Sequence, residues 1–155
     1  MNKKSRSVSS HNRATNLRQC LLRASRIINT EIVERLHLSG FTELRSTHTA
    51  LLSNLDLEGS NLTMVAQRAG MTKQAMGRLA DELISLKYIT KTRSEYDKRE
   101  VKLEFTPPGL KLMNQSFNIM EELENRCANR LGKDRFKNLL ISLQDIVDEF
   151  ESDGE

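Results

Sequence analysis

The chain has 155 residues, of which 37% are hydrophobic and 29% are charged, and its net charge is +3. This length and composition predict one globular domain with helical extensions. No apolar run approaches the roughly 18 residues that span a membrane, and no apolar leader follows the basic N-terminus, so we expect a cytoplasmic protein. The two cysteines, Cys20 and Cys127, match no metal-binding or redox spacing and predict no disulfide.

The charges are distributed unevenly along the chain. Residues 1–26 contain seven basic and no acidic residues, and residues 60–111 contain ten basic and six acidic ones. The segments 27–59 and 112–155 are net acidic. Two positive segments indicate a polyanionic partner, although a charged run is more often an ordinary solvated surface. The sequence motifs must therefore decide between these two interpretations.

The N-terminal part divides into a polar arm and a helix. Residues 1–14 are rich in Ser, Lys, Arg and Asn, and we expect a disordered basic arm that either adds phosphate contacts or is inert. Over residues 15–40, apolar residues recur every three or four positions, which predicts a long amphipathic helix. These residues are Leu17, Leu21, Ala24, Ile28, Ile32 and Leu36. A second, shorter helix is predicted over residues 46–55.

The segment "NLTMVAQRAGMTKQAMGRLADELISLKYI", residues 61–89, predicts two helices joined by a tight turn. Gly70 supplies a position where a positive φ angle carries no steric penalty, and Thr72 is a suitable N-cap for the second helix. Ala66 lies four residues before Gly70 and Met76 lies six residues after it. This is the spacing of a helix-turn-helix, whose recognition helix would cover about residues 72–87.

The polar side of the second helix has residue types that are able to read DNA. A recognition helix presents its first turns to base edges, where Arg or Lys donates to guanine and Gln pairs with adenine. The predicted DNA-binding residues here are Thr72, Lys73, Gln74, Gly77 and Arg78. Asp81 and Glu82 come later, where they would be kept away from phosphates. The alternative interpretation is an ordinary helical hairpin with a solvated face.

Residues 88–106 predict a charged β-hairpin. The residues from Val101 to Phe105 alternate between apolar and charged, which is the period of a strand with one buried face. Lys98 and Arg99, near the tip, suit contacts with phosphates or with the minor groove. Asp97 is placed to accept hydrogen bonds from loop amides and from Arg99, which would orient the guanidinium. A helix-turn-helix followed by such a ribbon is a winged helix.

Two more helices are predicted over residues 107–152. Thr106 and Pro107 are typical of a helix start, and Gly132 separates the two helices. Both helices have an apolar stripe that one small domain cannot cover, so pairing of two copies is the economical solution. The predicted fold is mainly α with a small β-hairpin. It consists of a winged helix-turn-helix over residues 44–106 between long N- and C-terminal dimerisation helices.

The run "DKREVKLEFTPPG", together with the helix-turn-helix before it and the helices after it, resembles the MarR family of bacterial transcriptional regulators. The resemblance extends over about residues 15–150. It implies a homodimer that places two recognition helices in the major groove of a pseudo-palindromic operator and two wings in the flanking minor grooves. By this resemblance Arg99 is the minor-groove arginine and Asp97 structures the wing. It implies a repressor of transcription, with a small-molecule effector that releases the DNA as a further partner.

Other functions were weighed against this one. A winged helix also serves as a protein-interaction or RNA-binding module, and a thiol at Cys20 between Arg18 and Arg23 would suit a redox-sensing regulator. Metal sensing has little support, because the histidines form no ligand spacing. These histidines are His11, His37 and His48. No phosphate-binding loop, nucleophile motif or metalloprotease motif is present, so we expect no enzyme activity and no cofactor. The sequence assigns no effector-binding residues.

Overall fold

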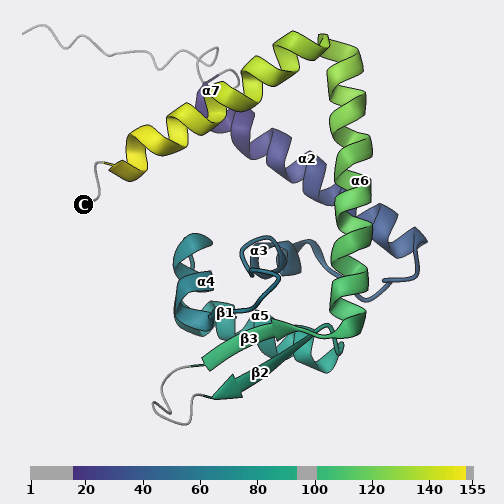
Figure 1. Ribbon diagram of the computed structural model, residues 1–155, viewed down its shortest axis with the longest axis vertical. Helices are drawn as coiled ribbons and strands as arrows, with labels where there is room; N and C mark the ends of the chain where they lie inside the picture. The colour runs from purple at the N-terminus through teal and green to yellow at the C-terminus, as the bar shows by residue number, and fades with distance from the viewer. Residues whose placement is uncertain (1–15, 94–100, 153–155) are drawn as a thin grey trace, which may run out of the picture. The chain divides into compact units, whose positions relative to one another are not determined.

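The computed structural model describes residues 16–93 and 101–152, and the chain divides into two compact units, residues 1–113 and 114–155. Figure 1 shows the helices and the small sheet that the sequence predicts. The helices are α2 (Leu17–Leu38), η1 (Ser46–His48), α3 (Thr49–Leu52), α4 (Leu62–Arg68), α5 (Lys73–Ser85), α6 (Pro107–Leu131) and α7 (Lys133–Ser152). The strands are β1 (Ser60–Asn61), β2 (Ile89–Arg93) and β3 (Val101–Phe105). This architecture confirms the predicted fold class.

The sheet has one strand more than the sequence indicates. β2 and β3 pair antiparallel, as predicted, and β1 adds to the other edge of β3, so the order is β1-β3-β2 (Figure 1). Leu103 lies at the centre, opposite Ser60 on one side and Lys91 on the other, and its side chain is fully buried. The prediction of a two-stranded ribbon was therefore incomplete. Two residues are too few to show the alternation that identifies a strand.

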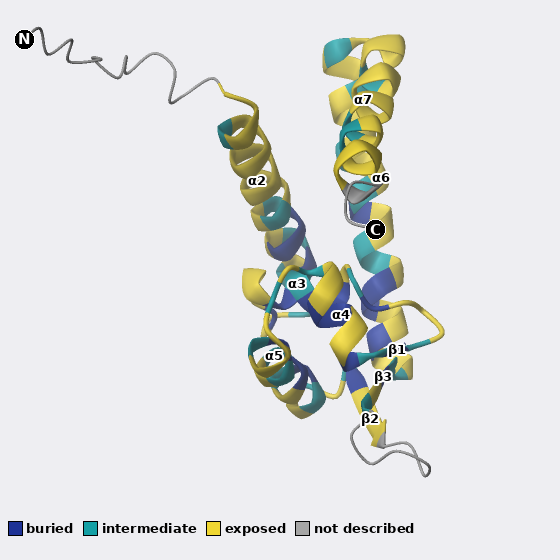
Figure 2. Cartoon of the chain, turned by 90° about the vertical axis from the view of Figure 1, so that its left-hand side faces the viewer, coloured by how far each residue is buried: buried dark blue, intermediate teal, exposed yellow. Residues whose placement is uncertain are grey.

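The core of the first unit lies between the helix-turn-helix, α3 and the sheet, where Figure 2 shows the buried residues in dark blue. Met76 and Leu83 of α5 are fully buried. Ala80 is buried as well, whereas Leu79 and Leu86 are only half-buried. Met76, Ala80 and Leu83 have the spacing of one helical face, which is the face that packs into the core. The small side chain of Ala80 lets the neighbouring elements approach α5 closely.

Three helices of this unit end with the same backbone turn. After α4, the Gly70 N–H donates to the Gln67 carbonyl and the Met71 N–H to the Ala66 carbonyl, which is the Schellman arrangement. Gly70 has a φ of 62°, which confirms its predicted role. α2 ends in the same way at Gly40. α5 also ends in this way, but Lys87 takes the glycine position with a φ of 63°.

Lys87→Gly is expected to stabilise the protein by up to about 1 kcal/mol, because a left-handed conformation strains every residue that has a β-carbon. Urea unfolding followed by circular dichroism measures this change. Lys87→Ala is the matched control, since it removes the same charge and long side chain but keeps the β-carbon. An equal gain from glycine and alanine would contradict the assignment of strain to the backbone of Lys87.

The terminal helices leave much of their apolar surface exposed. In α2 only Ile32, Val33 and Leu36 are buried, and no residue of α7 through Phe150 is buried. The exposed large apolar residues of these two helices are Leu17, Leu21, Leu22, Ile27, Ile28, Leu38, Leu139, Leu140, Ile141, Val147 and Phe150. Gly132 separates α6 from α7 with a φ of 90°, as predicted. No helix among the described residues is both long enough and apolar enough to cross a membrane.

Candidate nucleic-acid interface

The recognition helix α5 begins with the predicted cap. The Thr72 hydroxyl accepts a hydrogen bond from the Ala75 N–H at 3.1 Å, which satisfies one of the free amides of the first turn. Met76 is buried, as the helix-turn-helix spacing requires. The first turns of α5 are therefore held in a defined place against α4.

The predicted DNA-binding residues of α5 lie together on its exposed side. Lys73, Gln74 and Arg78 are exposed, and Gly77 is half-exposed between them. At 3.6 residues per turn, this side of the helix points away from the buried positions Met76, Ala80 and Leu83. The structure thus groups two cations, one amide and one bare backbone position on a single surface.

Gly77 is unusual because nothing inside the protein requires it. It lies within α5, where glycine costs about 0.5–1 kcal/mol relative to alanine. A β-carbon at this position would have no neighbouring atom within 4 Å among those it could meet. Packing within the chain therefore does not explain the glycine. A bare stretch of helix beside Lys73 and Gln74 does suit the close approach of an external partner.

The tip of the wing lies outside the described residues, and with it Asp97, Lys98 and Arg99. Their predicted roles remain predictions. The base of the wing is described and contains a contact that the sequence did not indicate. Lys91 Nζ of β2 lies 2.6 Å from Asp81 Oδ1 of α5. Both groups are exposed, so this ion pair contributes less than about 1 kcal/mol, but it joins the wing to the recognition helix.

A second polar cluster secures the loop that leads into β1. The Ser60 hydroxyl donates to Asp56 Oδ2 at 2.6 Å, and Arg68 Nη1 lies 2.9 Å from both carboxylate oxygens of Asp56. The hydrogen bond from Ser60, followed by that from Arg68, lowers the pKa of the Asp56 carboxyl. Arg68 closes α4, so the cluster ties β1 to the first helix of the helix-turn-helix.

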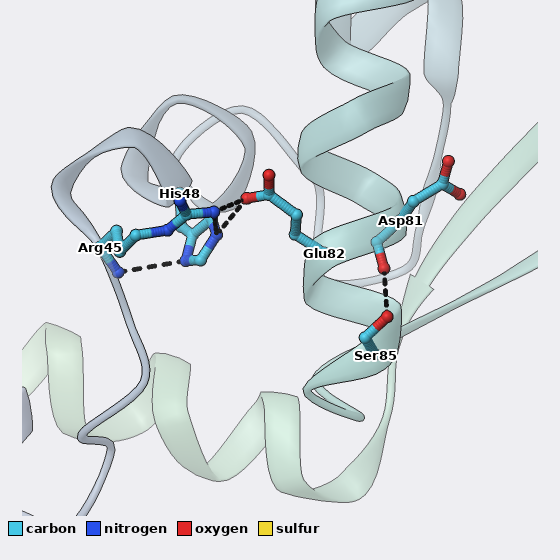
Figure 3. A network of polar contacts seen from close by, with 5 residues as sticks. All are labelled: Arg45, His48, Asp81, Glu82 and Ser85. Carbon is cyan, nitrogen blue, oxygen red and sulfur yellow. Dashed lines mark hydrogen bonds and ion pairs between the residues drawn. The ribbon is translucent and has the colours of Figure 1, made fainter.

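His48 is the buried polar residue that links η1 to the recognition helix (Figure 3). Its Nδ1 accepts from the Arg45 N–H at 3.1 Å, and its Nε2 lies 2.9 Å from Glu82 Oε2. The Arg45 guanidinium also pairs with Glu82. The hydrogen bond from His48, followed by that from Arg45, lowers the pKa of the Glu82 carboxyl. The sequence had suggested only that Glu82 stays away from phosphates.

From the sequence alone, His48 was weighed only as a metal ligand. Glu82 lies 34 positions further along the chain. No pattern within one helix connects residues that far apart, so only the structure shows this contact. Within residues 16–93 and 101–152, no three His, Cys, Asp or Glu side chains are arranged to hold a metal ion. Cys20 and Cys127 are both exposed in the single chain.

The end of the wing is joined to α6 by the Thr106 side chain. Thr106 Oγ1 donates to the Lys87 carbonyl at 2.6 Å and accepts from the Gly109 N–H at 3.1 Å, which confirms the predicted helix cap. The Thr106 N–H also donates to the Tyr88 carbonyl at 3.0 Å. A β-carbon at Gly109 would overlap that same carbonyl group. The Thr-x-x-Gly motif therefore allows α6 to start directly against the end of α5.

Residues 43–100 match the family model described as "MarR family". A comparison with curated protein sequences finds no significant match to this chain.

Solved structures share the fold over most of the chain. The transcriptional repressor CouR bound to a 23-mer DNA duplex is 24% identical with a TM-score of 0.71, and the match covers 90% of this chain and 98% of that one. CouR from Rhodococcus jostii RHA1 bound to p-coumaroyl-CoA is 19% identical with a TM-score of 0.66, and the match covers 86% of this chain and 92% of that one. A MarR transcriptional regulator from Methanosarcina mazei Go1 is 18% identical with a TM-score of 0.71, and the match covers 86% of this chain and 92% of that one. At these identities the likeness establishes the winged-helix fold.

Proposed function

We propose that this chain is a member of the MarR family and acts as a sequence-specific, double-stranded DNA-binding regulator of transcription, because residues 43–100 match the family model. We further propose that it acts as a repressor, because the similar CouR structure is that of a transcriptional repressor on a DNA duplex. The family and the similar structures are those of regulators and not of enzymes, so the proposal includes no catalytic step. It places the protein in the cytoplasm, with access to DNA.

The exposed side of α5 is the observation that carries this proposal. Lys73, Gln74 and Arg78 follow the Thr72 cap on the first turns of the helix, where a recognition helix meets base edges. Thr72 and Gly77 complete this surface. Lys or Arg suits guanine and Gln suits adenine, so the surface has the chemistry for direct reading of the major groove.

The wing supplies the second part of the proposed contact. The paired strands β2 and β3 flank residues 94–100 in the sequence, and these residues include Lys98 and Arg99. We assign these two side chains to the minor groove and its phosphates, and Asp97 to the support of Arg99. The Asp81–Lys91 ion pair supports this assignment, because it holds the base of the wing against the recognition helix.

The terminal helices are the proposed dimer interface, with residues 15–40 and 107–152 contributing. The first half of α2 and the whole of α7 expose apolar side chains in the single chain, among them Leu21 and Phe150. A second copy would bury such stripes by symmetry. Two recognition helices in one dimer then fit two half-sites of a pseudo-palindromic operator about one helical turn apart.

A small-molecule effector is a natural extension of this function. CouR has been solved both with DNA and with p-coumaroyl-CoA. We propose that an effector that prefers one arrangement of the dimer releases this protein from its operator, because differential affinity for two states is what shifts a population. The chemical class of that effector is not assigned.

Lys73→Ala is expected to weaken binding to the operator by about 5-fold to 150-fold, which corresponds to the loss of one base contact of about 1–3 kcal/mol. The operator is obtained first by selecting bound duplexes from a random library, and the affinities are then measured by titration at fixed salt. Lys111→Ala is the matched control, since it removes the same charge from an exposed position on α6. Light scattering of the same samples should give the mass of a dimer.

Three outcomes would contradict the proposal or part of it. Equal affinity of the wild-type protein for selected and random duplexes would remove sequence-specific recognition. An equal loss on both duplexes with Lys73→Ala would assign this side chain to phosphate. No salt-dependent binding to duplex DNA at all would favour the protein-interaction or RNA-binding alternative.

A further inference from the structure

A continuous chain of hydrogen bonds runs from α2 to the recognition helix. His37, in the last turn of α2, lies with its Nε2 2.7 Å from the Leu44 carbonyl oxygen. That carbonyl and the Arg45 N–H belong to the same peptide group. The Arg45 N–H donates to His48 Nδ1 at 3.1 Å, and His48 Nε2 lies 2.9 Å from Glu82 Oε2 on α5.

The direction of every hydrogen bond in this chain follows from its end groups. A carbonyl oxygen can only accept, so His37 Nε2 carries a proton. A backbone N–H can only donate, so His48 Nδ1 offers its lone pair and the ring proton lies on Nε2, facing Glu82. The 3.4 Å approach of Arg45 Nη2 to His48 Nε2 therefore brings together two donors that share one carboxylate oxygen, and it is not itself a hydrogen bond.

His48, at the centre of the chain, is shielded from water, whereas Arg45 and Glu82 are accessible to it. The His48 side chain is 2% exposed, whereas the side chains of Arg45 and Glu82 are 60% and 42% exposed. Both ring nitrogens of His48 are thus used inside the protein, one toward η1 and one toward α5. Hydrogen bonds in such a shielded chain strengthen one another, since each polarises the next.

We propose that His48 is a positioning residue that fixes the recognition helix relative to α2 through the His37–Leu44–Arg45–His48–Glu82 chain. This inference rests on the proposed function, in which α2 contributes to the dimer and α5 reads DNA. A dimer recognises two half-sites only when its recognition helices have the matching separation. Because this chain of hydrogen bonds connects α2 to α5, its side chains determine the separation of the two recognition helices in the dimer. That separation in turn determines the preferred half-site spacing.

Variants of His48 separate its two hydrogen bonds. His48→Asn keeps an acceptor near the place of Nδ1 but is too short to reach Glu82. His48→Gln instead carries a donor near the place of Nε2 and so retains the link to α5. Glu82→Ala removes the acceptor at a partly exposed position, and it reports on the same link should His48→Asn not fold. All variants are compared at a temperature at which circular dichroism shows the full helix content.

The experiment measures affinity for the selected operator and for two duplexes with one base pair inserted or deleted between the half-sites. The wild-type protein should lose at least about tenfold in affinity on the altered duplexes, because half-site spacing is a geometric requirement. His48→Asn and Glu82→Ala break the link to α5, and His48→Gln breaks the link to the Arg45 N–H, so each variant should bind the operator about tenfold more weakly and show a much smaller spacing penalty than the wild type. Losses from His37→Leu and His48→Asn should be less than additive, since both interrupt one chain.

The result that overturns the inference is distinct from failure of the proposed function. If the wild-type protein prefers no duplex, the proposed function itself fails. If it prefers the operator and folded His48→Asn or Glu82→Ala keeps both the affinity and the full spacing penalty, His48 does not position α5. A residue that merely stabilised the fold would change the melting temperature and leave the spacing preference unchanged.

Discussion

Gly109→Ala is expected to lower the free energy of unfolding by at least about 3 kcal/mol, which is at the upper end of overpacking effects. A β-carbon at this position would overlap the carbonyl group of Tyr88. That carbonyl cannot move away easily, because it accepts the Thr106 N–H and follows directly after the end of α5. The added methyl group must therefore separate α6 from the winged helix. Urea unfolding followed by circular dichroism measures the loss.

Gly77→Ala is the matched control for this prediction. It makes the same chemical change inside another helix, at a position where the β-carbon would have no neighbour within 4 Å. Alanine should stabilise α5 there by about 0.5–1 kcal/mol through helix propensity alone. The two glycines should thus respond with opposite signs. A small effect at Gly109 would show that α6 does not need its close approach to Tyr88.

Gly77→Leu is expected to reduce affinity for the operator to the level of random DNA, a loss of about 10³-fold or more. The prediction rests on the proposed function, in which this side of α5 enters the major groove. Four added carbon atoms between Lys73, Gln74 and Arg78 would hold the helix away from the base edges, while contacts with phosphates persist. Titration of operator and random duplexes at the same salt concentration measures both affinities.

Stability provides the internal check on that result. Leucine is a good helix former, so Gly77→Leu should melt no lower than the wild-type protein. Ser85→Leu is the matched control, since it adds a similar side chain to the exposed side of α5 about 12 Å further along the helix axis. A folded Gly77→Leu variant that still binds the operator tightly would exclude Gly77 from the contact. The bare surface beside Lys73 would then need another explanation.

Local patterns in the sequence determined most of the architecture. The helix-turn-helix followed from Ala66, Gly70 and Met76, and the starts of α5 and α6 followed from the side chains of Thr72 and Thr106. Each of these signals acts within one or two turns of the chain, so it can be read without knowing what packs nearby. The alternation of apolar and charged residues in β3 and the polar residues on the first turns of α5 are short-range signals of the same kind.

Only the tertiary structure decided which distant side chains meet. The third strand β1, the Asp81–Lys91 ion pair and the His48–Glu82 contact join residues between 10 and 43 positions apart, and no periodic pattern connects them. Gly109 could be recognised as part of a motif, but its reason, the carbonyl of Tyr88, becomes visible only when α6 packs against the end of α5. Short-range preferences thus determined the elements. Packing determined the angles at which the recognition helix, the wing and α2 are held, because those angles depend on contacts that form only after the chain has folded.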